Sequence, residues 1–236
     1  MASLRPVRIG LNDFADQPVS ICGKSFRAHM SGAVYWPSQN ALIVSDLQFA
    51  NGSAQERAAR RETSETLRSI AGLVDTYAAS TIIALGDGGL STGTAGAMQA
   101  SDRDTLRMIQ EDCDWIWIVP GIDRDAARVL GGTIVPEVTV QGIRLSHRPR
   151  PGTITHEVAG ALHPAARLVR HGTARRRPCF VSNGLRLIMP AFDAVSGGLN
   201  VLDAAFEALL GGDSVAVWML GQEGLYPVAP RLLRED

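Results

Sequence analysis

The sequence has no long apolar segment, few cysteines and no nucleotide-binding P-loop. No stretch approaches about 18 uninterrupted apolar residues, and no apolar run follows the basic residues near the start, so we expect neither a membrane span nor an export signal. The three cysteines, Cys22, Cys113 and Cys179, are too far apart for a zinc knuckle or a redox pair. They predict reduced, buried thiols and a cytoplasmic protein. The Gly-, Ser- and Thr-rich segment 86–96 is a predicted loop that lacks the Gly-Lys-Ser/Thr ending of a P-loop.

The chain also lacks net charge of either sign. A formal charge of -1 produces no global field of the kind that marks many nucleic-acid binders, so any contact with DNA has to come from local arginine clusters. The 236 residues are 45% hydrophobic and 20% charged, which is ordinary for a globular protein with a sizeable core. No repeat or Pro-, Gly- or Ser-rich linker divides them, and we expect a single domain, 1–236.

Short apolar runs rich in valine, isoleucine and tryptophan recur between turn signals, and they predict strands. The runs are 33–36, 41–44, 81–85, 115–119, 143–147, 177–181, 185–189 and 214–220. Apolar residues at helical spacing predict helices over 55–78, over 102–111 with Ser101 as its N-cap, and over 202–210. Strands and helices that alternate and then give way to strands favour sheets packed face to face with helices outside.

Carboxylates and imidazoles occur near the ends of several predicted strands. Asp46 and Asp87 each follow a buried strand, where a fold can aim side chains at a common point. Either aspartate alone is more often a turn or cap residue. His147 ends one strand and His163 precedes another, and aspartate together with neutral imidazole suits zinc, iron or manganese. The four residues together predict a metal site.

These residues stand in a characteristic order along the chain. The pieces are Asp46-Leu47-Gln48, Gly86-Asp87, Gly121-Ile122-Asp123, His147 and Gly160-Ala161-Leu162-His163. Their order and spacing resemble Asp-x-His, Gly-Asp, Gly-Asn-His-Asp, a lone His and Gly-His-x-His, which is the signature of the calcineurin-like metallophosphoesterases. The segments 45–49 with 52–54, 145–149, 163–167, 189–192 and 196–200 look like the bacterial ligase-associated DNA-damage-response endonuclease branch of that superfamily.

The resemblance runs from about Val34 to Val228 and implies both a fold and a chemistry. The implied fold is α/β, a two-sheet β-sandwich flanked by helices in four layers. In the family that it resembles, two divalent metals share a bridging aspartate, and a metal-bound hydroxide attacks a phosphoester. A histidine of Gly-Asn-His-Asp assists the leaving group.

The first metal of the family maps onto Asp46, Gln48, Asp87 and His163. Three of these positions keep the family's ligand type. Gln48 replaces a histidine, and its neutral carbonyl oxygen is a weaker donor than imidazole for a transition metal. The resemblance therefore implies a first site that still binds an ion, though less tightly.

The second metal maps onto Asp87, Ile122, His147 and Ala161, of which two keep the family's ligand type. Asp123 either replaces a missing ligand, if its loop brings it inward, or caps a helix that begins near residue 124. The leaving-group histidine has no counterpart, since Ile122 cannot transfer a proton. The replacements imply at most one well-held divalent ion (Mn, Fe or Zn) and two-metal catalysis that is impaired or lost.

The function implied is that of a metallophosphoesterase-like protein related to DNA-repair phosphodiesterases. The alternatives are a non-catalytic relative that binds nucleic acid or a DNA-repair protein, and a phosphate- or nucleotide-binding module. Arg148 and Arg167 follow His147 and His163 and are candidate substrate-binding residues, together with the run 175–177, although such basic runs are often solvated turns. The sequence makes no prediction about the oligomeric state.

Overall fold

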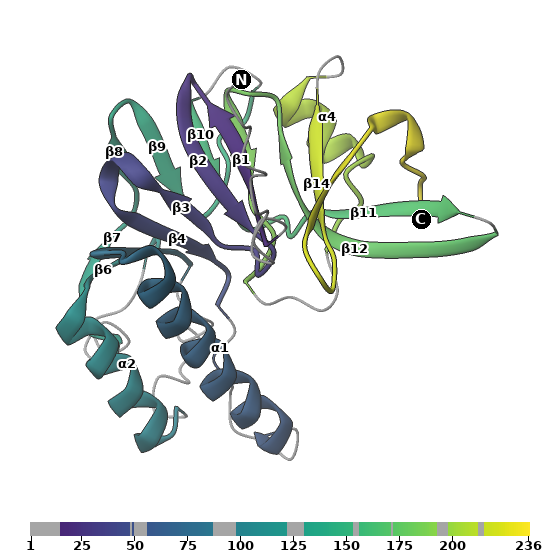
Figure 1. The fold of residues 1–236 in the computed structure, drawn as a ribbon. Helices are drawn as coiled ribbons and strands as arrows, with labels where there is room; N and C mark the ends of the chain where they lie inside the picture. The colour runs from purple at the N-terminus through teal and green to yellow at the C-terminus, as the bar shows by residue number, and fades with distance from the viewer. Residues whose placement is uncertain are drawn as a thin grey trace, which may run out of the picture.

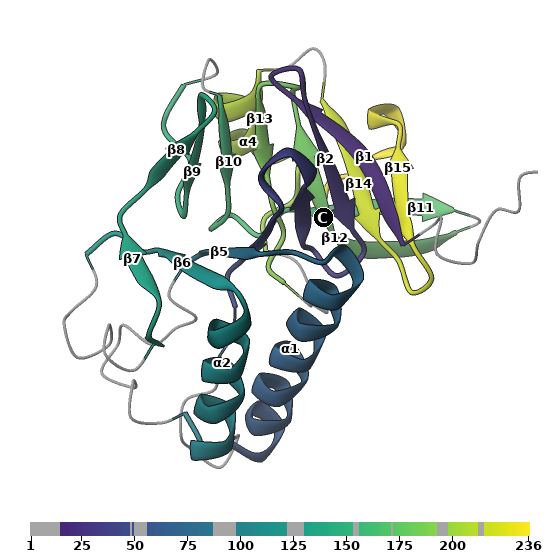
Figure 2. The same cartoon turned by 60° about the vertical axis from the view of Figure 1, so that its left-hand side comes forward.

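The structure is a computed structural model that describes residues 15–47, 49, 56–86, 98–121, 130–152, 156–170, 172–192, 198–211 and 215–236, with the backbone alone for 56–62 and Arg170. Within these residues the chain forms two sheets, and Figures 1 and 2 show how helices cover their outer faces. This arrangement confirms the expected α/β fold of two sheets flanked by helices.

The first sheet has seven strands in the order of the sequence. They are β1 (Asp16–Ile21), β2 (Lys24–His29), β3 (Val34–Trp36), β4 (Ala41–Ser45), β5 (Thr81–Leu85), β6 (Asp114–Ile118) and β7 (Thr133–Val135). A short 3-10 turn, η1 (Pro37–Gln39), joins β3 to β4. Strands β1 to β4 pair antiparallel, whereas β4 to β7 pair parallel. The carboxyl ends of β4, β5 and β6 therefore lie along one edge.

The second sheet has eight strands, and seven of them form one continuous order. That order is β15 (Leu225–Val228), β14 (Ala216–Leu220), β12 (Thr173–Ser182), β13 (Arg186–Ile188), β10 (Glu157–Ala159), β9 (Ile143–Ser146) and β8 (Val138–Val140). The eighth, β11 (Ala165–Arg170), pairs with the first half of β12, and the two form a hairpin that projects from the body of the protein (Figure 1).

Helices α1 (Glu56–Tyr77) and α2 (Ala100–Asp112) pack side by side against the first sheet, as both views show. Helix α4 (Ala204–Leu210) and the turn η2 (Pro230–Leu232) lie with the second sheet. In the described residues no helix is long and apolar enough to cross a membrane.

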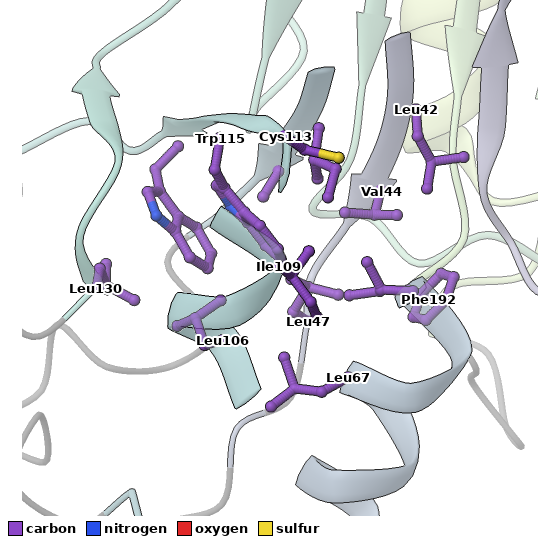
Figure 3. Packing of buried hydrophobic residues seen from close by; sticks show 14 of the residues in the cluster. Leu42, Val44, Leu47, Leu67, Leu106, Ile109, Cys113, Trp115, Leu130 and Phe192 are labelled. Carbon is purple, nitrogen blue, oxygen red and sulfur yellow. The ribbon is translucent and has the colours of Figure 1, made fainter. Parts of the chain in front are cut away.

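Three apolar clusters fill the spaces between these layers. Leu67 of α1 and Leu106 of α2 pack against Val44 under the first sheet (Figure 3), while Ile43 faces the second sheet. All five residues of β4 are buried because both faces of its sheet are covered. Phe206 belongs to the third cluster, under α4.

Several expectations need correction in detail. Helix α2 begins at Ala100, so Ser101 lies inside its first turn; Gln99 is the N-cap and makes no side-chain cap bond. All three thiols are free, as predicted, but Cys22 is half-buried, whereas Cys113 and Cys179 are buried. Segment 87–96 and the helix expected near residue 124 lie outside the described residues.

Candidate functional site

Two strand ends from different sheets meet at Asp46 and His147. Strand β4 ends at Ser45, and the Asp46 amide donates a hydrogen bond of 2.9 Å to the carbonyl of Leu85, the last residue of β5. Strand β9 ends at Ser146, and the carbonyl of His147 accepts a 3.0 Å bond from Gly160. The backbone of each residue is therefore held by its neighbouring strand, and the side chains converge.

The Asp46 carboxylate is the centre of the cluster, and its side chain is 12% exposed. Its Oδ1 lies 2.6 Å from His147 Nε2. Its Oδ2 accepts hydrogen bonds from the Ser45 hydroxyl at 2.6 Å and from the Ala161 amide at 3.0 Å. His163 Nε2 lies 3.2 Å from the same oxygen. Four groups thus surround one carboxylate.

The contact between His163 and Asp46 differs from the others. Although Nε2 lies 3.2 Å from Oδ2, the approach lacks the alignment of a hydrogen bond. Nε2 is buried and has no hydrogen-bond partner among the described residues. A buried polar atom without a partner is costly, and among the described residues the indole nitrogens of Trp36 and Trp115 also lack one, although neither of these belongs to the cluster. His163 Nε2 is therefore the atom of the cluster with capacity for a ligand.

The cluster holds Asp46 as a carboxylate. Burial alone would raise the pKa of Asp46, but the contacts with His147, His163 and Ser45 outweigh that effect and hold the pKa well below its usual range. In return, the Asp46 carboxylate raises the pKa of His163 above its ordinary value, against the opposite effect of burial. The site thus combines a fixed negative charge with an imidazole whose protonated form it stabilises, so a metal ion at His163 Nε2 would have to displace that proton.

The backbone of the cluster is strained at three non-glycine residues. Asp46, Ala161 and His163 have φ values of 50°, 67° and 47°, in the left-handed region. This conformation costs roughly 1–2 kcal/mol per residue and persists where the surrounding structure imposes it. In this conformation the Ala161 amide donates a hydrogen bond to the Asp46 side chain.

Two glycines make room for the cluster. A Cβ at Gly160 would lie 1.9 Å from Ser45 Oγ and 2.8 Å from Asp46 Oδ2. A Cβ at Gly86, whose φ is 111°, would lie 3.3 Å from His147 Nε2. Any side chain at position 160 would therefore displace the carboxylate.

The structure brings together three of the predicted site residues, Asp46, His147 and His163. Gln48, Asp87 and Asp123 lie outside the described residues, as does Ile122, so their expected roles stay predictions. Ser45, Gly160 and the amide of Ala161 were missed, because small residues and backbone groups leave no distinctive pattern in a single sequence.

The donor types at the cluster fit one divalent ion, since a carboxylate and two imidazoles suit zinc, iron or manganese. The orphaned Nε2 of His163 supports that fit. The Asp46–His147 distance of 2.6 Å, however, is shorter than the about 3 Å between neighbouring donors around an ion with bonds of about 2.1 Å. Among the described residues, no three Asp, Glu, His or Cys side chains have the spacing to hold an ion together.

A buried ion network supports the loop that follows His147. The side chains of Glu157 and Arg186 are 0% exposed, and Arg186 Nε donates to Glu157 Oε2 at 2.8 Å. Arg186 also donates to the carbonyls of Arg150 at 2.7 Å and Gly152 at 2.8 Å. Arg144 binds the other oxygen of Glu157. The buried Arg186 therefore holds the loop 148–152 through two of its main-chain carbonyls.

That loop borders a cavity of about 430 Å³ beside the cluster. Pro149, Pro151 and Leu209 of α4 line it together with Ala161, whose amide donates to Asp46. Arg148 is exposed at its edge. Arg167, the other predicted substrate-binding residue, lies on β11 and bonds through Nη1 to the Glu235 carbonyl at 2.6 Å.

Comparison with known proteins supports the fold. No family model and no curated protein matches the chain. Among solved structures, it is similar to the crystal structure of the Pseudomonas putida nuclease MPE, with a TM-score of 0.70 and 24% sequence identity over 90% of this chain and 100% of that chain. At this level of identity the match shows that the chain shares the two-sheet α/β fold of that nuclease.

Proposed function

We propose that the protein is a metallophosphoesterase-like phosphodiesterase of the DNA-repair type, in which the usual two-metal catalysis is impaired. The observation that carries the proposal is the convergence of Asp46, His147 and His163 at the ends of strands from both sheets. The fold shared with a nuclease supports the same class of substrate.

In this proposal one divalent ion (Mn, Fe or Zn) is held by Asp46 and His163, with His147 beside them. Such an ion supplies Lewis-acid polarisation of a phosphoryl oxygen. Asp46 stays ionised at neutral pH, and Ser45 and the Ala161 amide orient it.

The surroundings of the cluster limit what it can do. Ala161 stands where the resembled family has a histidine, and it offers Asp46 a backbone N–H instead of an imidazole. The exposed Arg148 can bind a phosphate oxygen at the edge of the cavity. Substrate binding therefore has more support in the described residues than a second metal does.

The runner-up is a non-catalytic relative that binds nucleic acid or a repair partner on the same scaffold. The short Asp46–His147 contact favours it, because a carboxylate and an imidazole that bond directly need no ion between them. The two proposals make different predictions about metal content.

Metal analysis of the purified protein, combined with a manganese-dependent assay on bis-p-nitrophenyl phosphate, separates them. The phosphodiesterase is supported if the protein contains metal and turns over the diester, and if Asp46→Asn loses both. The exposed control Asp104→Asn should keep both. Substoichiometric metal and no turnover would exclude it and favour the binding relative. Restoring Gln48→His and Ala161→His together should raise metal occupancy; unchanged occupancy would contradict the assignment of these positions.

A further inference from the structure

The β11–β12 hairpin presents two arginines side by side. In the antiparallel register Arg167 lies directly opposite Arg176, so both side chains leave the same face of the hairpin. Arg175 and Arg177 alternate with Arg176 along β12 and belong to the other face. The hairpin therefore carries positive charge on both faces, and the Arg167–Arg176 pair is one compact unit of it.

An acidic residue covers Arg176, one member of this pair, while Arg167 bonds to the neighbouring Glu235 carbonyl. Arg176 donates from Nε to Asp236 Oδ1 at 2.9 Å and from Nη2 to Oδ2 at 3.2 Å, which is a two-pronged contact with the carboxylate. The segment that carries Asp236 runs along β11: Leu233 pairs with Leu168, and the amide of Arg234 donates to the Arg167 carbonyl at 2.9 Å. Figure 1 shows this end of the chain lying against the hairpin.

The covered pair lies close to the candidate site. Arg176 also donates to the Gly198 carbonyl, and the Gly198 amide donates to the His163 carbonyl at 2.5 Å. A Cβ at Gly198 would lie 2.9 Å from His163 Cβ, so the two residues are in close contact. One residue thus separates Arg176 from the histidine of the cluster.

We propose that the Arg167–Arg176 pair is a binding site for a backbone phosphate of a nucleic acid strand, and that Asp236 occupies the Arg176 side of it until the strand displaces the carboxylate. The inference rests on the proposed function for the identity of the anion, a phosphodiester. A guanidinium binds carboxylate and phosphate with the same two-pronged geometry, so one can replace the other.

The Asp236 contact has the properties of an exchangeable one. The side chains of Arg176 and Asp236 are 32% and 52% exposed, and ion pairs this accessible to water and salt are weak. Arg176 holds the pKa of Asp236 below its ordinary value, so the carboxylate is charged at neutral pH.

The test measures binding without turnover. Fluorescence anisotropy with a labelled single-stranded DNA oligonucleotide, in EDTA, compares Asp236→Asn with Glu235→Gln. Both variants remove one negative charge from adjacent positions, but the structure shows the main-chain carbonyl of Glu235, not its carboxylate, as the acceptor for Arg167. Asp236→Asn should tighten binding about threefold to fivefold, whereas Glu235→Gln should change it by less than about 1.5-fold.

Arginine variants test the other half of the contact. Arg176→Ala should weaken binding about fivefold and reduce the slope of log affinity against log salt by about 1, whereas Arg107→Ala, a 68% exposed arginine on α2, should change neither. In the Arg176→Ala background, Asp236→Asn should no longer tighten binding. Equal effects of the Asp236 and Glu235 variants, a gain from Asp236→Asn that survives without Arg176, or no binding by any variant would each overturn the inference.

The proposed function is tested separately, by hydrolysis of the small diester, which is too short to span the hairpin and the site. If the protein shows no turnover but Asp236→Asn still tightens binding, the phosphodiesterase proposal is wrong and the covered phosphate site stands. If the protein turns over the diester but Asp236→Asn has no effect on binding, the phosphodiesterase proposal stands and the covered site is wrong.

Discussion

The Asp46 carboxylate and the His147 imidazole lie 2.6 Å apart although 101 residues separate them in the chain. Asp46 follows the fourth strand of the first sheet and His147 follows a strand of the second, so the contact joins the ends of the two sheets. A second link runs nearby, where the Phe192 amide donates to the Ser45 carbonyl at 2.8 Å. The site therefore lies where the ends of strands from the two sheets meet.

Replacing Asp46 by asparagine should lower the pKa of His163. The carboxylate raises that pKa in the folded protein, and a neutral amide cannot, so His163 should lose its proton at a lower pH in the variant. NMR titration of the histidine ring protons measures the change in metal-free protein. Asp104→Asn, on the exposed face of α2, is the control, and an identical His163 titration in Asp46→Asn would contradict the contact.

Gly160→Ala should destabilise the protein, because its Cβ would fall 1.9 Å from Ser45 Oγ and 2.8 Å from Asp46 Oδ2, so the hydroxyl and the carboxylate would both have to shift. Overpacking of this kind costs about 1–3 kcal/mol. Gly72→Ala is the matched control, since nothing lies within 4 Å of its Cβ and it sits inside α1, where alanine should stabilise by about 0.5–1 kcal/mol. Thermal unfolding should shift in opposite directions in the two variants.

Glu157→Gln should be far more damaging than Glu137→Gln, although both glutamates bind Arg144. Glu157 is 0% exposed and its loss leaves Arg186 buried beside a neutral amide, which costs about 3–5 kcal/mol. Glu137 is 39% exposed, and its ion pair should contribute at most about 1 kcal/mol. Urea unfolding measures both.

Replacing both members of the buried pair tests the reason for that cost. Glu157→Gln with Arg186→Met should recover part of the stability lost by Glu157→Gln alone, because the double variant buries no uncompensated charge. The single variant Arg186→Met completes the comparison. If the double variant loses as much unfolding free energy as the two single variants together, or more, the damage comes from lost loop contacts and not from unpaired charge.

Stability should fall in acid partly through Asp16. Burial would raise its pKa, but bonds from Arg27 at 2.5 and 2.8 Å and from Tyr77 at 2.8 Å lower it below the ordinary 3.8. The unfolded chain therefore binds a proton first as the pH falls, and the stabilisation present above about pH 4 is lost below it. Asp16→Asn should show a smaller drop in unfolding free energy between pH 7 and 3 than the unaltered protein; equal drops would exclude Asp16 as a source.

Much of the fold was predictable because its central strands are strongly apolar. The runs that became β4 and β5 are almost wholly buried, and those that became β6 and β14 bury three of their five residues, as covered sheets require. Strands β1 and β2 were missed because DQPVSI and KSFRAH contain no apolar run, and Pro18 lies within β1. The Ser101 cap was wrong because a serine near a helix start is a signal with many false positives, and here the helix begins at Ala100, two residues before the predicted start.

The sequence by itself determined which residues end strands and which carry carboxylate, imidazole or guanidinium groups, since these follow from local patterns of a few residues. Only the tertiary structure decided that Asp46 meets His147 and His163, that Gly160 leaves room for the carboxylate, and that Asp236 covers Arg176. Each of these contacts joins segments far apart in the chain. Their geometry depends on how two whole sheets pack, and no local pattern encodes that packing.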